Sequence, residues 1–503
     1  MRYIDRFLNS ITMYRLVLIG LEILAAISLV ATFFGKLSFN WIGLIVSFLV
    51  LMIVCYVVNF GLAKVLKAPM NIESAGITAL ILFFIIAPPE SGTEVLTIVA
   101  LAALAMISKF AFTINHKHLF NPAAIAAVII GLGGSGMAIW WVGSVVLLPF
   151  TLILGLLIVR KIRRFEMFAT FLLVSLLALI ISGISVGQTW TEVLAVSVTS
   201  WPLIFFGTIM LTEPATTPPG RKWQIMYAAV VGVLFSIQFK IGSLYSTPEL
   251  ALVTGNIFSY IVSPKQKLCL ILESSRRLSG DIYEFIFLTK SKLIFKAGQY
   301  LEWTLPPLHL DNRGNRRYFT IASSPTEETI RLGVRVFEKS SSFKKQLMAL
   351  KSGEEIFAAQ LSGDFVLPTD KTKKLVFIAG GIGITPFRSM IKYLIDQNEK
   401  RDIVLLYAVL TPENFVYRDI FEEAKSIGLR TEYVITDSTK VPNNWSGRVG
   451  YINEKMLSTV MTDYKERMYY LSGPEAMVAT YTTLLCGVGI PRKQVRKDYF
   501  PGF

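Results

Sequence analysis

Apolar residues dominate the first half of the chain in long, closely spaced runs. Each run is long enough to cross, or nearly cross, the roughly 30 Å of hydrocarbon in a bilayer. We therefore predict a multi-pass α-helical membrane domain with ten spans over residues 1–263. The runs lie at 14–34, 40–63, 74–88, 93–110, 119–134, 138–159, 166–185, 190–211, 223–240 and 248–263.

Beyond about residue 266 the pattern changes to short stretches of alternating apolar and polar residues. These predict strands of a small β-barrel domain over 266–370. From about residue 372 predicted strands and helices alternate, which is typical of an α/β doubly wound domain, here 371–503. The barrel strands are expected at 267–272, 282–287 and 299–303, and the parallel strands at 375–379, 403–409 and 431–435.

Lysine and arginine are distributed unevenly over the predicted loops. With the N-terminus inside, fifteen of them fall in inner segments and only two, Lys36 and Lys240, in outer loops. An excess of this kind marks the cytoplasmic side of a membrane protein. We therefore expect a multi-pass protein of the cell (inner) membrane with both termini in the cytoplasm. The inner residues are Arg2, Arg6, Arg15, Lys64, Lys67, Lys109, Lys117, Arg160, Lys161, Arg163, Arg164, Arg221, Lys222, Lys265 and Lys267.

The amino-acid composition argues against several classes of protein. With 53% hydrophobic and 17% charged residues the chain is too apolar for one soluble domain. The net charge of +15 is explained by the inner loops, so nucleic acid is not an expected partner. Cys55, Cys269 and Cys486 cannot supply the four thiolates of a ferredoxin-type cluster. Three histidines are too few for a two-haem transmembrane cytochrome, and we expect no metal site.

A glycine-rich turn follows the first predicted parallel strand. It contains Gly380, Gly381 and Gly383, and Thr385 with Pro386 opens the next helix. Glycine lets the backbone approach a phosphate closely, and a helix N-terminus favours an anion. This strand, turn and helix therefore predict a site for a dinucleotide pyrophosphate.

A second motif lies in the predicted barrel. Arg317 can pair with a diphosphate, Phe319 can pack on a flat ring, and Thr320 can hydrogen-bond a ring nitrogen. Downstream, Ser341 and Ser342 open a predicted helix whose free amides suit a second phosphate contact. An ordinary barrel strand and a simple helix cap are the alternatives for these two segments.

Together with Ser472-Gly473-Pro474, these motifs resemble the ferredoxin-NADP reductase superfamily over about 266–503. The resemblance implies FAD on Arg317, Phe319 and Thr320, and Ser472 near the nicotinamide, so that Thr320 and Ser472 are the catalytic candidates. It implies NAD(P)H on Gly380, Gly381, Gly383, Thr385 and Pro386. Phe319 stands where many members have tyrosine. The terminal Phe503, or Phe500, would cover the flavin, unless the end of the chain is a plain tail.

Four polar residues at the ends of predicted spans are candidates for a membrane site: Glu73, Asn121, Glu213 and Glu249. A proline follows both Asn121 and Glu213, and such broken helices often line a site. Glu73 and Glu249 begin similar segments, which suggests an inverted repeat. The alternatives are a plain loop at Glu213, and carboxylates favoured by the helix dipole at Glu73 and Glu249.

The segments 73–88, 118–124 and 211–214 resemble the ten-span membrane subunit shared by Rnf complexes and sodium-pumping NADH:quinone reductases. The resemblance covers about residues 1–263. Members bind membrane flavins, often with one FMN esterified to a threonine after the fifth span. This chain has no threonine in the corresponding segment 131–138. The resemblance therefore implies non-covalent FMN or riboflavin, or a flavin carried by a partner.

These expectations combine into a membrane-bound NAD(P)H-dependent flavin oxidoreductase. Electrons would pass from cytoplasmic NAD(P)H through FAD to a membrane or extracytoplasmic acceptor, either an extracytoplasmic flavoprotein or a quinone. The alternative is a redox-driven or redox-regulated cation transporter, which Glu73 and Glu249 motivate. A haem-containing ferric reductase or superoxide-generating oxidase is disfavoured by the few histidines.

Overall fold

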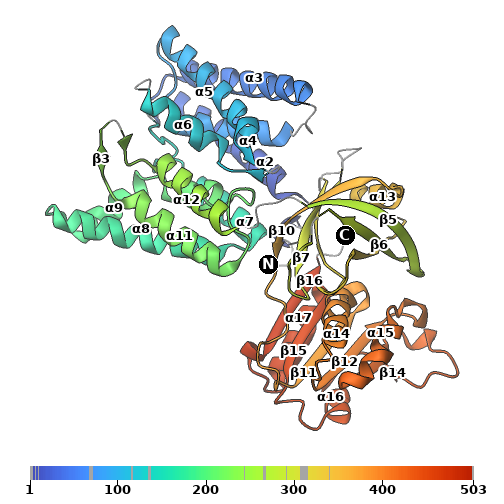
Figure 1. Ribbon diagram of the computed structural model, residues 1–503. Helices are drawn as coiled ribbons and strands as arrows, with labels where there is room; N and C mark the ends of the chain where they lie inside the picture. The colour runs from blue at the N-terminus through green and yellow to red at the C-terminus, as the bar shows by residue number, and fades with distance from the viewer. Residues whose placement is uncertain are drawn as a thin grey trace. The chain divides into compact units, whose positions relative to one another are not determined.

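The computed structural model divides the chain into two compact units, Met1–Gln266 and Lys267–Phe503 (Figure 1). The first unit consists of helices with two short hairpins, and the second contains two six-stranded sheets. The structure describes residues 4–5, 7–8, 11–66, 72–114, 117–133, 138–242, 244–263, 268–290, 292–305, 315–338 and 340–500.

Side-chain caps start several helices of the first unit. Thr12, Asn40 and Ser91 each accept a hydrogen bond from an amide in the first turn that follows, which satisfies a donor the helix cannot use. The helices are α2 (Met13–Phe33), α3 (Trp41–Val65), α4 (Ile72–Ile85), α5 (Gly92–Ala111), α6 (Pro122–Leu132), α7 (Leu148–Ile162), α8 (Phe165–Ser185), α9 (Trp190–Thr199), α10 (Leu203–Phe205) with the π-helix η1 (Phe206–Met210), α11 (Arg221–Ser236) and α12 (Pro248–Val262). The hairpins are β1 (Thr113–Ile114) with β2 (Lys117–His118), and β3 (Lys240–Ile241) with β4 (Leu244–Tyr245).

Four of these helices, α2, α3, α5 and α8, are long and apolar enough to cross a membrane by length and composition. The bent pair formed by α9 and α10–η1 would be a fifth. Helices α4 and α6 are apolar but have only 14 and 11 residues, fewer than the roughly 20 that a membrane crossing takes. In the described residues the ten-span count is therefore not confirmed.

Two of the predicted spans are helical over only part of their length. The span expected at 138–159 is wrong in its first ten residues, because α7 starts at Leu148. The irregular segment before α7 instead donates from Ile139 N and Trp140 N to Ile85 O, at 2.8 and 3.0 Å, where α4 ends. The span expected at 190–211 bends by 64° between α9 and α10–η1, and Pro202, which has no amide to donate, caps α10 at that bend.

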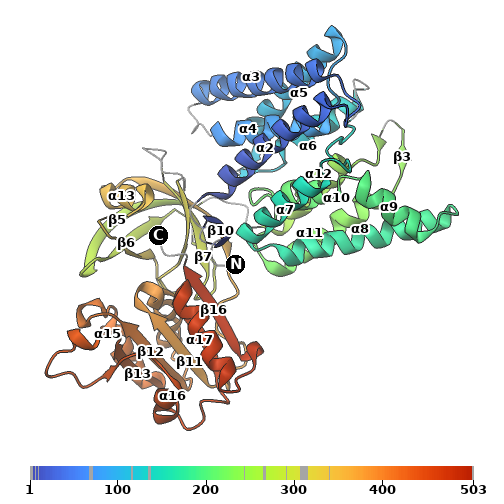
Figure 2. The ribbon, with the colours of Figure 1, turned by 180° about the vertical axis from the view of Figure 1, so that it is seen from behind.

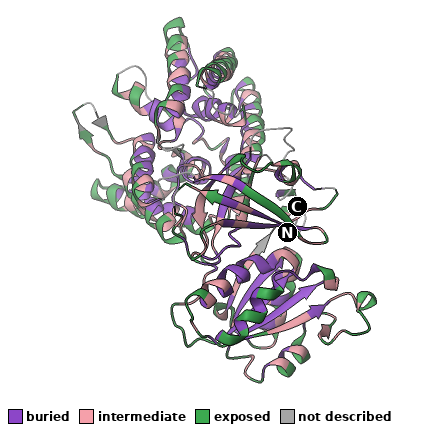
Figure 3. Cartoon of the chain, turned by 45° about the vertical axis from the view of Figure 1, so that its right-hand side comes forward, coloured by how far each residue is buried: buried purple, intermediate pink, exposed green. Residues whose placement is uncertain are grey.

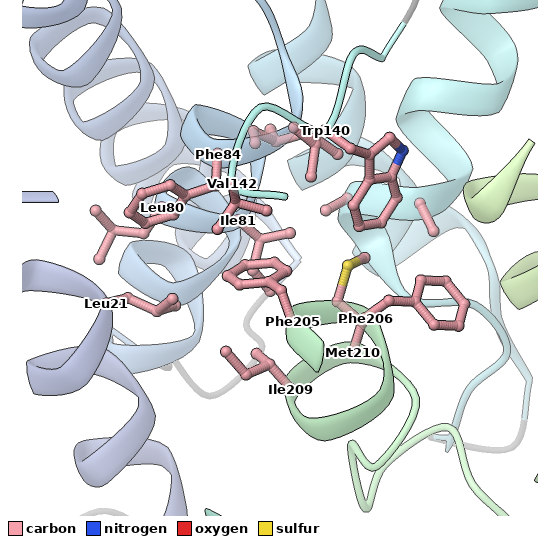
Figure 4. Packing of buried hydrophobic residues seen from close by; sticks show 14 of the residues in the cluster. Leu21, Leu80, Ile81, Phe84, Trp140, Val142, Phe205, Phe206, Ile209 and Met210 are labelled. Carbon is pink, nitrogen blue, oxygen red and sulfur yellow. The ribbon is translucent and has the colours of Figure 1, made fainter. Parts of the chain in front are cut away.

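The interrupted elements of the first unit meet in one apolar core. Figure 4 shows Phe205, Phe206 and Met210 from α10–η1 beside Phe84 of α4 and Trp140 of the irregular segment before α7. Ring centroids of Phe84 and Phe205 are 5.8 Å apart, and those of Trp140 and Phe206 are 5.7 Å apart. All five residues are at most 4% exposed. Aromatic packing therefore holds the helix breaks together.

The sheet that begins the second unit is antiparallel, with strand order β8-β7-β10-β5-β6-β9. Alternate residues of β5, Leu268, Leu270 and Leu272, enter a core around the fully buried Trp303, as the period of a strand dictates. Its elements are β5 (Leu268–Ser279), β6 (Ile282–Thr289), β7 (Tyr300–Thr304), β8 (Arg316–Thr320), β9 (Ile330–Arg335), α13 (Ser342–Ala349) and β10 (Glu355–Ser362).

The following sheet is parallel, with strand order β14-β13-β12-β11-β15-β16. Its elements are β11 (Leu375–Gly380), η2 (Gly381–Ile384), α14 (Thr385–Asp396), β12 (Ile403–Val409), η3 (Pro412–Asn414), α15 (Arg418–Glu423), η4 (Ala424–Ile427), β13 (Leu429–Ile435), η5 (Ser438–Lys440), β14 (Arg448–Val449), α16 (Glu454–Val460), β15 (Met468–Pro474), α17 (Glu475–Gly487), η6 (Arg492–Gln494) and β16 (Val495–Phe500).

Helices cover both faces of the parallel sheet (Figures 1 and 2). Leu375 and Phe377 of β11 pack in a core with α14 and α15, whereas Val376 and Ile378 pack with α16 and α17. Every residue of β11 and β12 is buried, and Figure 3 colours the central strands purple. The continuous apolar runs in these strands follow from burial on both faces. The doubly wound domain expected from sequence is confirmed as a fold.

Candidate functional site

The glycine-rich turn lies at the carboxyl end of β11, where ligands bind in doubly wound sheets. Gly380 ends the strand, Gly381 and Gly383 lie in the single 3-10 turn η2, and Thr385 begins α14. The Thr385 hydroxyl donates to Ile382 O at 3.2 Å. Pro386 sits in the first turn of α14, where a missing amide costs nothing.

Two glycines of the turn have different surroundings. Gly381 has a φ of +55° and no atom within 4 Å of the position that a Cβ would take. A Cβ on Gly383 would lie 2.4 Å from Ser472 O. Gly381 therefore leaves open space above the turn, as close approach of a phosphate requires, and Gly383 lets the turn pack against β15.

The flavin motif forms strand β8, which pairs with β7. The indole nitrogen of Trp303 on β7 donates to Phe319 O at 3.2 Å. The Arg317 guanidinium lies 5.5 Å from the ring centroid of Phe343, and the Phe319 ring lies 5.7 Å from the same ring. Phe343 belongs to the first turn of α13, so the two predicted phosphate contacts, at Arg317 and at the start of α13, lie together.

The serines before and in α13 act as caps. The Ser341 hydroxyl accepts from Lys344 N at 3.5 Å, and Ser342 is the first residue of the helix. The cap that the sequence left open as an alternative is therefore present. A role of the start of α13 in phosphate binding stays a prediction. Phe503 lies outside the described residues, and of Phe500 only the backbone of β16 is described.

Tertiary packing joins the two motifs through β16. The Thr320 hydroxyl, at the end of the flavin strand, donates to Asp498 Oδ2 at 3.5 Å. Asp498 is the register partner of Ser472 on β15, and Ser472 borders the turn at Gly383. Ser472 is fully buried, and in the described part of the chain its hydroxyl has no hydrogen-bond partner. An unsatisfied buried hydroxyl beside an open glycine turn fits a polar ligand group.

Asp498 was not among the residues expected from the sequence. A lone acidic residue in a short terminal strand gives no signal of its own. It becomes a candidate only because β16 lies beside β15 in the sheet and its carboxylate reaches β8. Among the described residues no group of three or more His, Cys, Asp or Glu could hold a metal ion.

In the first unit the structure brings Asn121 and Glu213 together. Asn121 Oδ1 caps α6 by accepting from Ala123 N and Ala124 N at 3.1 and 3.2 Å, while its Nδ2 donates to Glu213 Oε2 at 2.8 Å. Asn121 N donates to Asn256 Oδ1 at 2.9 Å. The proline that follows Asn121 is thus the first residue of a capped helix rather than a break inside one.

Asn256 on α12 extends this contact, because its Nδ2 donates to the Tyr227 hydroxyl on α11 at 3.2 Å. Both residues are fully buried. Neither was expected as a site residue, since a single Asn or Tyr in an apolar run has no pattern. Asn121, Glu213, Asn256 and Tyr227 together form a buried polar cluster, which joins the start of α6 and the turn after η1 to the interiors of α11 and α12.

The two glutamates of the suspected repeat have unlike surroundings. Glu249 is 4% exposed and accepts a 2.9 Å hydrogen bond from the indole nitrogen of Trp140. The Glu73 side chain is 33% exposed and forms an ion pair with Arg15 at 3.6 Å. Each lies one residue after the start of its helix, α4 or α12, as the helix dipole favours. The structure does not bring either one to Asn121 or Glu213 through a hydrogen bond among the described residues.

Comparison with known proteins supports the assignment of the second unit. Residues 377–483 match the family of oxidoreductase NAD-binding domains. Similar proteins include a stachydrine N-demethylase reductase subunit of Rhizobium meliloti, 27% identical over 229 residues, which are 44% of this chain and 63% of that protein. A glycine betaine monooxygenase reductase subunit of Pseudomonas aeruginosa is 27% identical over 44% of this chain and 60% of its own length. A flavohemoprotein of Halalkalibacterium halodurans is 23% identical over 46% and 59%.

The chain therefore spans less than two thirds of the length of these relatives. Among solved structures, the cytochrome P450 reductase GcoB of Amycolatopsis matches 47% of this chain and 70% of its own, with 22% identity and a TM-score of 0.42. The FAD/NAD-binding domain of nitric oxide dioxygenase from Vibrio cholerae matches 46% of this chain and 98% of its own, with 16% identity and a TM-score of 0.41. What these comparisons show for the second unit is an oxidoreductase NAD-binding domain over residues 377–483.

Proposed function

We propose that the protein is a membrane-bound NAD(P)H-dependent flavin oxidoreductase. The observation that carries this proposal is the meeting of the two motifs within one unit. Thr320 at the end of the flavin strand contacts Asp498, whose neighbour Ser472 borders the glycine-rich turn of the NAD-binding domain. The names of the relatives, reductase subunits and a flavohemoprotein, support the same reaction class.

The chain offers separate places for the two cofactors. Arg317, Phe319 and the start of α13 would hold FAD, and Gly381 with the N-terminus of α14 would hold the pyrophosphate of NAD(P)H. When bound, FAD supplies the capacity to take a hydride from the nicotinamide and to pass electrons on one at a time. Ser472, whose buried hydroxyl has no partner among the described residues, would bind a polar group of the ligand, and Asp498 would orient the Thr320 hydroxyl that donates to it.

The proposal includes an acceptor beyond FAD. Apolar helices α2, α3, α5 and α8 support a membrane location for the first unit, and the lysine and arginine distribution favours termini in the cytoplasm. We propose that electrons pass to non-covalent FMN or riboflavin in this unit, or to a quinone or an extracytoplasmic flavoprotein. The buried polar cluster of Asn121, Glu213, Asn256 and Tyr227 is the candidate site.

The test begins with the visible spectrum of the purified full-length protein. We expect flavin absorbance, bleached by NADH or NADPH without oxygen, and no Soret band. A protein without flavin, or one whose flavin is not reduced by either nucleotide, would contradict the proposal. Retention of the chain in membranes washed with alkaline carbonate tests the location separately.

A second candidate function is redox-driven or redox-regulated cation transport. The observation that favours it is the burial of the Glu249 carboxylate against Trp140, since a buried carboxylate is costly unless it serves a purpose. Sealed proteoliposomes given NAD(P)H would accumulate or expel a cation if it is correct. Electron transfer with no change in internal sodium or pH would contradict it.

A further inference from the structure

Helix α14, which continues from the glycine-rich turn, is hydrogen-bonded to the segment that follows the flavin strand. Arg388 Nη1 donates to Ala322 O at 2.9 Å, and the Ser389 hydroxyl donates to Ser323 O at 2.6 Å. Both terminal nitrogens of Arg388 also bind the Glu327 carboxylate, with Nη2 2.8 Å from Oε1. We call these contacts of Arg388 and Ser389 with Ala322, Ser323 and Glu327 the α14 clamp.

The acceptor side of the clamp is itself fixed. Glu327 Oε2 accepts from Ser324 N at 2.6 Å, and Glu327 Oε1 lies 3.2 Å from Arg331 Nε. Arg331 N donates to the Ser323 hydroxyl at 3.1 Å. The turn between β8 and β9 is therefore held in one shape by its own hydrogen bonds, and it presents two carbonyls and a carboxylate to α14.

Burial makes the clamp stronger than a surface ion pair. The side chains of Arg388 and Glu327 are 4% and 14% exposed, so solvent and salt screen the pair little. A two-nitrogen, two-oxygen contact also fixes orientation as well as distance. Apolar packing between the same elements would tolerate sliding, whereas this geometry does not.

The position of the clamp links the two cofactor motifs. On one side, Ala322 and Ser323 follow Thr320 at the end of the flavin strand. On the other, Arg388 and Ser389 lie in the helix that Thr385 opens directly after the glycine-rich turn. The clamp thus ties the backbone next to each motif to the backbone next to the other.

We propose that Arg388 is a positioning residue for hydride transfer, which sets the glycine-rich turn at a fixed distance from the flavin strand. The proposal rests on the proposed reductase function. Hydride donor and acceptor must approach to about 3–3.5 Å, and a misplacement of about 1 Å can cost roughly a hundredfold in rate. Arg388 lies in the helix that follows the turn, binds protein groups, and acts on the reaction through these contacts.

The test compares Arg388→Gln with Lys392→Gln in the full-length protein. Lys392 lies one turn further along α14, and its ion pair in the described part of the chain is with Asp396 of the same helix, at 2.5 Å. In Arg388→Gln we expect normal FAD content, little change in the half-saturating NAD(P)H concentration, and a limiting rate of flavin reduction lower by about ten- to a hundredfold. We also expect a weaker long-wavelength charge-transfer absorbance, since that band depends on how closely the nicotinamide and flavin rings approach each other. Lys392→Gln should behave as the wild type.

Two further variants and one cofactor-free measurement keep the test decisive if Arg388→Gln binds flavin poorly. Arg388→Lys, which can still reach Glu327, should recover the rate to within about tenfold of the wild type, and Ser389→Ala should lower it. In flavin-stripped protein, hydrogen exchange at the Ser324 amide should be faster in Arg388→Gln, because its acceptor Glu327 loses its partner. A wild-type rate and charge-transfer band in both Arg388→Gln and Ser389→Ala, or unchanged exchange at Ser324, would overturn the inference. A wild-type protein that NAD(P)H does not reduce would instead overturn the proposed function, while the exchange experiment would still report on the clamp.

Discussion

Gly381 and Gly383 lie two residues apart in the turn after β11 and serve different purposes. Gly381 faces open space with a left-handed φ of +55°, and Gly383 lets the turn approach the carbonyl of Ser472. The sequence presents the two as equivalent members of one motif. Only the surroundings of each Cβ position separate the ligand-facing glycine from the packing glycine.

We expect Gly381→Val to keep its flavin while NAD(P)H-driven flavin reduction slows by orders of magnitude. The side chain would occupy the space that a pyrophosphate needs and would strain the left-handed backbone. Gly383→Ala should instead destabilise the protein, since its Cβ would lie 2.4 Å from Ser472 O. Anaerobic stopped-flow reduction and thermal release of flavin measure the two effects. Normal reduction in Gly381→Val would show that the turn is structural only.

Arg317→Ala should strip FAD from the protein, because the diphosphate loses its cation and Phe343 loses the guanidinium that lies over its ring. Arg316→Ala is the matched control: Arg316 pairs with Glu302 at 3.4 Å and precedes the motif. The measurement is flavin released per chain, identified as FAD or FMN by chromatography. Full flavin content in Arg317→Ala would reject the assignment of β8 as the flavin strand.

At the scale of elements, the ion pair between Arg388 and Glu327 joins helix α14 to the turn between β8 and β9. Burial alone would raise the pKa of the Glu327 carboxyl, but the hydrogen bonds and charge of Arg388 outweigh it and hold the pKa below its usual value. A carboxyl with a depressed folded-state pKa stabilises the fold above its unfolded pKa of about 4.3. That stabilisation is lost as the pH falls through the folded-state pKa.

Glu327→Gln should therefore lower stability at pH 7 by roughly 2 kcal/mol, because a charged hydrogen-bond partner of the buried Arg388 is removed. The difference from the wild type should shrink as the pH is lowered below about 4. Flavin fluorescence during heating, measured from pH 3.5 to 7, follows both proteins. A difference that stays constant over this range would show that Glu327 is not ionised in the fold.

Comparison of expected and observed helices and strands shows which elements a pattern of apolar residues can predict. Strand β12 occupies 403–409 as expected, because both faces of the central strand are buried and its residues are apolar throughout. The span expected at 138–159 is wrong in its first ten residues, because an apolar irregular segment and an apolar helix look alike in sequence. The backbone of that segment is satisfied by the end of α4, a partner more than fifty residues earlier in the chain.

At the scale of the whole molecule, two compact units share one chain, and the proposed function requires electrons to pass from the second to the first. The candidate membrane site is the polar cluster around Asn121 and Glu213. Because Asn121 also caps α6, a substitution there can act on the helix as well as on a site, and the experiment needs a variant that separates the two.

In Asn121→Leu we expect the NAD(P)H-driven reduction of a soluble dye through FAD to stay normal. The NAD(P)H-driven reduction of an impermeant acceptor outside sealed vesicles should stop. The variant loses both the cap and the amide that bonds Glu213, whereas Asn121→Ser keeps a capping oxygen and loses only the amide. If the site carries electrons, both variants should fail in delivery, and Asn121→Ser should keep the wild-type thermal stability. Wild-type delivery in both would place the polar cluster off the electron path.

The sequence by itself determined the classes of structure in this protein. Long apolar runs favour helices, since a helix pairs its own backbone groups in an apolar environment, although the run at 138–147 shows that a distant partner can replace the helix. Buried parallel strands require continuous apolar residues, and a glycine turn before a helix suits an anion. Those requirements act within a few neighbouring residues. The patterns in Gly380–Pro386 and in β8 can therefore be recognised in the sequence before any fold is known.

Only the tertiary structure decided which distant residues act together. Asp498 joins Thr320 to the region of Ser472, Arg388 joins α14 to the turn after β8, and Asn256 joins Asn121 to α12. Each contact links residues between 66 and 178 positions apart. No local rule favours such pairs, because their energy comes from burial and hydrogen bonding that exist only once the sheets and helices have packed.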